Sequence, residues 1–186
     1  MKEKIGKKEV VLISGPMKSG KSARLIEMYN DFSSKGITVE CFKNSIDTRD
    51  VGYIKSRAYD ETVPCTTLNN IKECINSKAD VVMIDEFQFI QAPIMADTVR
   101  HFIDNNRSLY IFGLDRIADG SKWPTYTAIK DLVDAEIQLK ADCEMCGRKG
   151  VAEYTKLESQ SNDLVQIENE LVKYYPVCKD CFFKKQ

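Results

Sequence analysis

The segment Gly15-Pro16-Met17-Lys18-Ser19-Gly20-Lys21-Ser22 is the most informative part of this sequence. It follows an apolar run, Val10 to Ile13, and precedes a segment with helical periodicity that opens at Ala23. In a phosphate-binding loop of this pattern, glycines let backbone N–H groups point at phosphate oxygens, and the next helix adds positive potential. Lys21 then reaches the outer phosphates, and the Ser22 hydroxyl suits a magnesium ligand. The segment therefore predicts nucleotide binding by a strand, loop and helix unit.

The composition is that of a folded protein without a general affinity for polyanions. Of the 186 residues, 43% are hydrophobic, which suffices for one domain with an apolar core and a small appendage. The 27 basic and 28 acidic residues give a net charge of -1, which argues against a nucleic acid partner. The charged N-terminus and short first apolar run predict no secretion signal and no membrane span. Seven cysteines, four of them in two C-x-x-C pairs, favour a reducing compartment, so we expect a cytoplasmic protein.

Buried strands that alternate with amphipathic helices predict an α/β fold around this loop. Consecutively apolar runs, which are typical of parallel strands, lie at residues 9–14, 79–86 and 108–113, and a further strand is expected at 37–43. Helical spacing marks the segments at 23–35, 68–77, 94–102 and 124–135, and an edge strand is expected at 136–140. Residues 51–67 fit either a loop or short strands. We therefore expect residues 1–141 to form a P-loop nucleotide-binding domain with a mostly parallel sheet flanked by helices.

Two acids, Asp85 and Glu86, close the apolar run at 79–86. Ligands bind at the carboxyl ends of the strands in an open α/β sheet, so both acids are expected in the site. In P-loop kinases an acid at this place holds magnesium, and we assign that role to Asp85. If strand pairing continued, Glu86 would point to the opposite side and face the acceptor as a general base. The alternative is that Glu86 is only a loop residue.

Four cysteines define a second unit, residues 142–186. Cys143 and Cys146 form one C-x-x-C pair, and Cys178 and Cys181 form the other. Four thiolates at this spacing are typical of a closed, structural zinc site. The segment between the pairs, 147–177, is too long for an ordinary loop in a compact domain. We therefore expect a zinc ribbon that tethers a lid.

Taken together, these motifs resemble those of the zinc-containing thymidine kinase family, which occurs in animal cells, many bacteria, poxviruses and some phages. The resemblance runs through G-P-M-K-S-G-K-S, F-K-N-S-I-D-T-R-D, I-D-E-F-Q-F, G-L-D, C-E-M-C-G and Y-x-x-V-C-K-D-C, in that order. It implies transfer of the γ-phosphoryl group of ATP to the 5′-hydroxyl of a deoxynucleoside, normally thymidine. It also implies Mg²⁺, structural Zn²⁺, a homotetramer, feedback inhibition by the triphosphate end product, and small-molecule partners without membrane or nucleic acid.

The resemblance also implies roles for individual residues. Glu86 corresponds to the base that accepts the 5′-hydroxyl proton and Asp85 to the acid of the magnesium site, while Asp47 and Arg49 correspond to a pair that supports metal and phosphate. Five positions correspond to the nucleoside pocket: Met17, Phe89, Leu114, Thr155 and Tyr174. Gln88 belongs to a motif, but no role is assigned to it. The segment between the cysteine pairs corresponds to a lasso over the nucleoside.

Departures from the family pattern concentrate in the acceptor pocket. The aromatic residue usual three positions after the Asp of G-L-D is replaced by Ala118, with Trp123 five residues further on. The lasso segment 166–173 lacks the usual pair of glycines, so its backbone would approach the nucleoside less closely. Leu157 replaces a basic residue, and Asp50 replaces a tyrosine.

Three hypotheses follow from these observations. The leading one is a deoxynucleoside kinase, for thymidine or for another or modified pyrimidine nucleoside. A second is a nucleic-acid-binding P-loop ATPase with a zinc ribbon, against which the net charge and the very short basic tail at 184–185 argue. A third is a catalytically silent relative, which would have no chemical need for Lys21, Ser22, Asp85 and Glu86.

Overall fold

A computed structural model describes residues 8–46, 50–56, 60–158 and 172–184 of this chain. Within these residues, the centre is a sheet of six strands in the order β5-β2-β6-β7-β1-β8, and each neighbouring pair is parallel. The strands are β1 (Val10–Ser14), β2 (Val39–Asn44), β5 (Thr66–Leu68), β6 (Val81–Asp85), β7 (Ser108–Gly113) and β8 (Ala135–Gln138). This sheet confirms the expected α/β fold.

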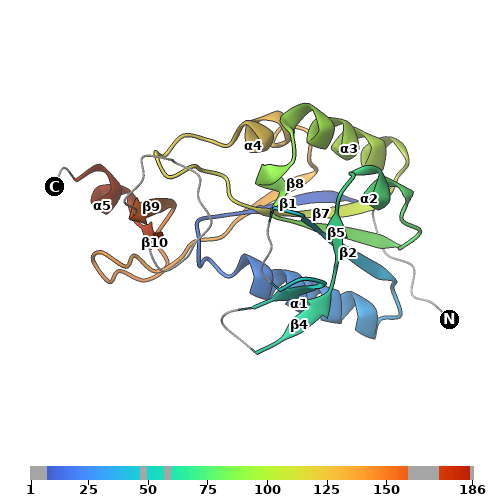
Figure 1. Ribbon diagram of the computed structural model, residues 1–186, viewed down its shortest axis with the longest axis horizontal. Helices are drawn as coiled ribbons and strands as arrows, with labels where there is room; N and C mark the ends of the chain where they lie inside the picture. The colour runs from blue at the N-terminus through green and yellow to red at the C-terminus, as the bar shows by residue number, and fades with distance from the viewer. Residues whose placement is uncertain (1–7, 47–49, 57–59, 159–171, 185–186) are drawn as a thin grey trace.

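Helices cover both faces of the sheet (Figure 1). One face carries α1 and a hairpin of β3 and β4, and the other carries α2, α3, α4 and the short 3-10 helix η1. Their bounds are α1 (Lys21–Ser34), β3 (Tyr53–Lys55), β4 (Thr62–Pro64), α2 (Lys72–Asn76), η1 (Phe87–Phe89), α3 (Ala92–Asp104) and α4 (Pro124–Ile129).

Strand β1 shows why the sequence of a central strand is apolar without interruption. Val10 and Leu12 belong to the core beneath α3 and α4, whereas Val11 and Ile13 belong to the core beneath α1. Side chains alternate between the two faces of a strand, so burial on both faces requires an apolar residue at each position. All five residues of β1 are buried.

Two helices are shorter than the sequence predicts. The helix expected at 68–77 begins only at Lys72, because Leu68 is the last residue of β5 and pairs with Asn44 of β2. The helix expected at 124–135 ends at Ile129, and Asp134 instead accepts a hydrogen bond from the Val10 backbone N–H at 2.8 Å. These long-range contacts override the local apolar periodicity that the two segments share with true helices.

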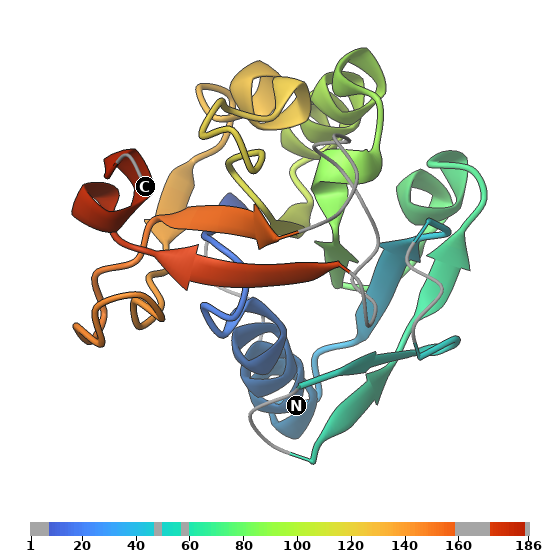
Figure 2. The same ribbon diagram turned by 60° about the vertical axis from the view of Figure 1, so that its left-hand side comes forward.

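The C-terminal module comprises the described residues from 141 onward. It contains the antiparallel pair β9 (Tyr154–Glu158) and β10 (Lys173–Val177), followed by α5 (Lys179–Phe183). The module has a small apolar core of its own, in which the rings of Tyr154 and Phe182 stack with centroids 4.5 Å apart. Figure 2 shows the hairpin beside the end of the sheet that carries the phosphate-binding loop.

None of the helices in the described part of the chain has both the length and the apolar character that crossing a bilayer requires.

Candidate functional site

The predicted phosphate-binding loop connects β1 to α1. Gly20 has a φ of 84° and caps the N-terminus of α1, so the helix begins at Lys21. Lys18 also has a positive φ, of 59°. A Cβ atom on Gly15 would lie 2.5 Å from the backbone oxygen of Leu139 and 2.8 Å from the Ser19 hydroxyl. Only glycine fits at position 15, and the close approach sets where the loop turns away from the sheet.

Lys21 points back into this loop. Its ammonium donates hydrogen bonds to the backbone oxygens of Gly15 at 3.1 Å and Pro16 at 2.6 Å. Burial lowers the pKa of Lys21 from its ordinary value, and nearby carboxylates, with Glu86 and Asp85 foremost, act in the opposite direction. The lysine is therefore a half-buried cation whose charge interacts with two nearby acids.

A cavity of about 430 Å³ joins the loop to these acids. Its wall contains Lys21 and Ser22 of the loop, Asp85 and Glu86 at the end of β6, and residues of β2 and β3. Ligand cavities in proteins typically measure about 300–1,000 Å³, so this one has room for a small ligand. The structure thus brings the predicted loop and the predicted acid pair to one cavity.

The two acids are held differently. Asp85 is the last residue of β6 and is 6% exposed, and its Oδ1 accepts a hydrogen bond from the Glu86 N–H at 3.0 Å. Glu86 has left the strand, with a φ of 56°. A left-handed backbone costs a non-glycine residue roughly 1–3 kcal/mol and persists only where the surroundings enforce it. The prediction for Glu86 assumed that strand pairing continued through this residue. In the structure β6 ends at Asp85, and the left-handed turn sets the direction of the Glu86 side chain.

Gln88 is a residue whose role the sequence did not reveal. It lies on η1, is buried, and donates a hydrogen bond from Nε2 to Glu86 Oε2 at 2.5 Å. Its Oε1 accepts one from the Leu114 N–H at 3.0 Å. The only signal in the sequence was its place in the I-D-E-F-Q-F motif.

The residues predicted for the nucleoside pocket fall into two groups. Met17 of the loop donates its N–H to Thr155 Oγ1 at 3.0 Å, which joins the loop to β9. Tyr174 lies in the same hairpin, on β10. Leu114 follows β7 and contacts Gln88, as described above.

The second group consists of Phe89 alone, which packs against a residue that was not predicted for the pocket, Trp123. The ring of Trp123 packs edge-on against Phe89 with centroids 5.7 Å apart, and its Nε1 donates to the Arg116 backbone oxygen. An aromatic ring therefore packs on Phe89, although position 118 itself carries alanine. Two predicted residues, Asp47 and Arg49, lie outside the described residues, as do residues 159–171 of the predicted lasso.

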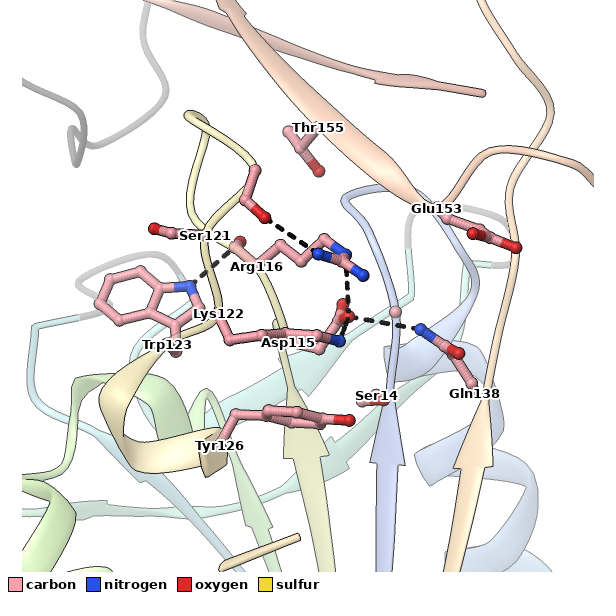
Figure 3. A network of polar contacts seen from close by, with 12 residues as sticks. Ser14, Asp115, Arg116, Ser121, Lys122, Trp123, Tyr126, Gln138, Glu153 and Thr155 are labelled. Atoms are coloured by element: carbon pink, nitrogen blue, oxygen red, sulfur yellow. Dashed lines mark hydrogen bonds and ion pairs between the residues drawn. The ribbon is translucent and has the colours of Figure 1, made fainter. Parts of the chain in front are cut away.

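A buried polar network fixes the strand ends beside the loop (Figure 3). The Asp115 carboxylate is 0% exposed and accepts hydrogen bonds from Lys122 at 2.7 Å and Gln138 at 3.3 Å. The Lys122 ammonium lies 4.3 Å above the Tyr126 ring centroid. Tyr126 in turn donates to Glu136 at 2.9 Å. These hydrogen bonds connect the segments that follow β7 and precede α4 with β8 and α4. We therefore interpret Asp115 as a structural residue of the G-L-D motif.

The four cysteines of the two C-x-x-C pairs come together in the C-terminal module. Their sulfur atoms all lie within 4.8 Å of one another, and those of Cys146 and Cys178 are 3.9 Å apart. With zinc–sulfur bonds of about 2.3 Å, a tetrahedral site requires sulfurs roughly 3.8 Å apart. The positions of Cys143, Cys146, Cys178 and Cys181 are therefore compatible with a zinc site.

Arg148 contacts both pairs of cysteines. It donates hydrogen bonds to the sulfur of Cys146 at 3.4 Å, to the sulfur of Cys178 at 3.0 Å, and to Asp180 at 2.6 Å. The hydrogen bonds from Arg148 are the main reason that the pKa of Cys146 falls to about 6. They favour the thiolate, which is the form that binds a metal.

Comparison with known proteins agrees with this geometry. The sequence profile of the family described as "Thymidine kinase" matches residues 8–182. A protein of that name from Pseudothermotoga lettingae is 29% identical over 182 residues, 95% of this chain and 95% of that protein. Another from Mycoplasma genitalium is 30% identical over 177 residues, 90% and 80% of the two chains. A third, from Yaba monkey tumor virus, is 29% identical over 175 residues, 93% of each chain.

The profile spans the phosphate-binding loop, the acid pair and the four cysteines alike. The motifs that carried the resemblance therefore belong to one continuous match. The chain belongs to the thymidine kinase family.

Proposed function

We propose that this member of the thymidine kinase family transfers the γ-phosphoryl group of ATP to the 5′-hydroxyl of thymidine, giving thymidine 5′-monophosphate and ADP. The observation that carries the proposal is the shared cavity, in which Lys21 and Ser22 face Asp85 and Glu86. Phosphoryl transfer needs a phosphate cradle and a proton acceptor within one small space. A silent relative would have no chemical use for this combination.

The proposed reaction divides between the two sides of the cavity. The loop N–H groups and Lys21 hold the triphosphate and stabilise the charge on the phosphoryl group in flight. Glu86 takes the proton of the 5′-hydroxyl while the oxygen–phosphorus bond forms and the bond to the β-phosphate oxygen breaks. A general base contributes typically about 10²–10⁴-fold to such a rate.

We further propose that Ser22 and Asp85 hold Mg²⁺, with Asp47 and Arg49 as supporting residues. A hydroxyl and a buried carboxylate are the hard oxygen donors that this ion prefers. When bound, Mg²⁺ neutralises charge on the phosphate oxygens. This role is consistent with the burial of Asp85, whose carboxylate lies at the wall of the cavity.

The proposed nucleoside pocket contains Met17, Phe89, Leu114, Thr155 and Tyr174. Trp123 packs against Phe89, so an aromatic pair is present there although position 118 carries alanine. We propose thymidine as the ligand from the family match, with another or modified pyrimidine nucleoside as the second candidate, because position 118 lacks the aromatic residue usual in the family.

We propose Zn²⁺ as the ion of the four-cysteine site, with a structural role, because four thiolates leave no open coordination position. The ion would hold the ends of the segment 147–177 and so position the hairpin that carries Thr155. The unit 142–186 is then a zinc-ribbon domain with a lasso over the nucleoside. From the family resemblance we add a cytoplasmic homotetramer under feedback inhibition by thymidine triphosphate.

The test of the function is a phosphorylation screen with Mg²⁺ and ATP across the common nucleosides, read by chromatography of the monophosphates. We expect thymidine monophosphate as the main product. Lys21→Ala should abolish turnover, whereas Lys35→Ala, which removes an exposed lysine paired with Asp31, should retain it. Absence of any phosphorylated nucleoside, or ATP hydrolysis stimulated by single-stranded DNA, would contradict the proposal.

Arg148 provides a separate test of the zinc site. Residues that hydrogen-bond metal ligands typically contribute about 10–100-fold to metal affinity. We expect Arg148→Ala to release zinc to a colorimetric chelator about 10-fold faster than the unaltered protein. Lys149→Ala is the matched control, because the exposed Lys149 ammonium forms an ion pair with the exposed Asp142 at 2.7 Å. Equal release from the Arg148 variant and the control would exclude a role of Arg148 at the metal.

A further inference from the structure

We infer that Gln88 is a positioning residue that holds the Glu86 carboxylate in place for phosphoryl transfer, an inference that rests on the proposed function. Gln88 is 3% exposed, so its amide is buried, and it lies beside Leu114, the residue that follows β7. Its amide bonds both the Glu86 carboxylate and the Leu114 N–H. Glu86 follows β6 and Leu114 follows β7, so Gln88 connects the ends of two strands. A buried amide with both ends bonded has no freedom to turn.

The direction of the amide follows from its partners. A backbone N–H can only donate, so the amide oxygen must face Leu114. The amide NH₂ group then faces Glu86, whose carboxylate oxygen accepts its hydrogen bond. Gln88 therefore directs a hydrogen-bond donor at Glu86 Oε2, which is the acceptor in this pair.

The sequence around β7 provides the space for this bridge. A Cβ atom on Gly113 would lie 2.2 Å from Gln88 Oε1 and 2.6 Å from the Phe87 ring. Any side chain at position 113 would displace the amide. The glycine of the G-L-D motif thus has a specific function here, which is to admit Gln88 from η1.

Gln88 and Asp85 restrain different parts of Glu86. Asp85 accepts the Glu86 backbone N–H at 3.0 Å, which supports the left-handed turn at Glu86. Gln88 contacts the end of the side chain, beyond three rotatable bonds. Without Gln88 the backbone direction would remain, but the carboxylate would lose one of the contacts that restrain it. A displacement of a catalytic group by about 1 Å costs roughly 10²-fold in rate.

The test uses two variants and a control. Gln88→Leu removes both hydrogen bonds, and Gln88→Glu keeps an oxygen for Leu114 but sets a second carboxylate against Glu86. We expect kcat for thymidine phosphorylation to fall about 10–10²-fold in both, with the KM for ATP nearly unchanged. Thr98→Val is the control, because Thr98 is equally buried and its hydroxyl donates within α3, to the Ile94 backbone oxygen at 2.8 Å. It should lower the melting temperature and leave kcat nearly as it was.

A double-variant cycle separates positioning from general stability. If Gln88 acts through Glu86, then adding Gln88→Leu to Glu86→Gln should lower kcat by less than about 2-fold more. An equal loss in both backgrounds, or wild-type kcat in a folded Gln88→Glu variant, would overturn the inference while the kinase activity stands. An unaltered protein that phosphorylates no nucleoside would instead overturn the proposed function, and the inference with it.

Discussion

Glu86→Gln is expected to lower kcat for thymidine phosphorylation by at least about 10²-fold, because glutamine cannot accept the proton of the 5′-hydroxyl. The substitution keeps the size of the side chain and its oxygen, so the cavity retains its shape. The dissociation constant of ATP should remain nearly unchanged, since we propose that the loop containing Lys21 makes the contacts with the triphosphate. Steady-state kinetics and calorimetric titration with ATP measure the two quantities separately.

A control for this variant is Glu27→Gln, which removes an exposed carboxylate of α1 that pairs with Arg24. It should have the kinetics of the unaltered protein. Unchanged kcat in Glu86→Gln would remove Glu86 from the mechanism. A large loss of ATP affinity in the same variant would instead assign Glu86 to nucleotide binding.

Cys178→Ser is expected to abolish stoichiometric zinc binding and to loosen the C-terminal module. Structural zinc sites contribute directly to the free energy of folding, and removal of one thiolate opens the tetrahedral set. Mass spectrometry of the metal content should show loss of zinc, and limited proteolysis should cut between residues 147 and 177. Turnover should also fall, because Thr155 of this module bonds the phosphate-binding loop at Met17.

Cys65→Ser is the matched control, since Cys65 is half-buried and lies outside the four-cysteine cluster. It should keep its zinc and its resistance to protease. If Cys178→Ser retained the same zinc content as this control, the four-cysteine site would be wrong. If zinc were lost without any change in proteolysis, the ion would not be what holds the module together.

The parts of the fold that were predictable depend on neighbouring residues in the sequence. A strand buried on both faces must be apolar at consecutive positions, so Val10 to Ile13 indicated a central parallel strand. The glycines of the phosphate-binding loop follow from local backbone geometry, as Gly20 at the start of α1 illustrates. Two C-x-x-C pairs are typical of a four-thiolate zinc site, so the sequence indicated that the pairs meet in the fold, although residues 147–177 separate them in the chain.

The parts that were not predictable depend on partners distant in the sequence. The end of α4 depends on contacts that Asp134 makes with the beginning of β1. The role of Gln88 depends on Leu114, which reaches it only through the pairing of β6 with β7. The missing aromatic at Ala118 suggested an open wall, but the packing of Trp123 on Phe89 could be seen only in three dimensions.

The most direct measurement is the crystal structure of the protein with thymidine, Mg²⁺ and a nonhydrolysable ATP analogue. The expected result places the triphosphate on the loop at residues 15–22 and the 5′-oxygen of thymidine about 2.6–3.2 Å from a Glu86 carboxylate oxygen. The γ-phosphorus should lie in line with that 5′-oxygen. A triphosphate bound elsewhere, or a 5′-hydroxyl beyond hydrogen-bonding reach of Glu86 in the closed complex, would contradict the proposed mechanism.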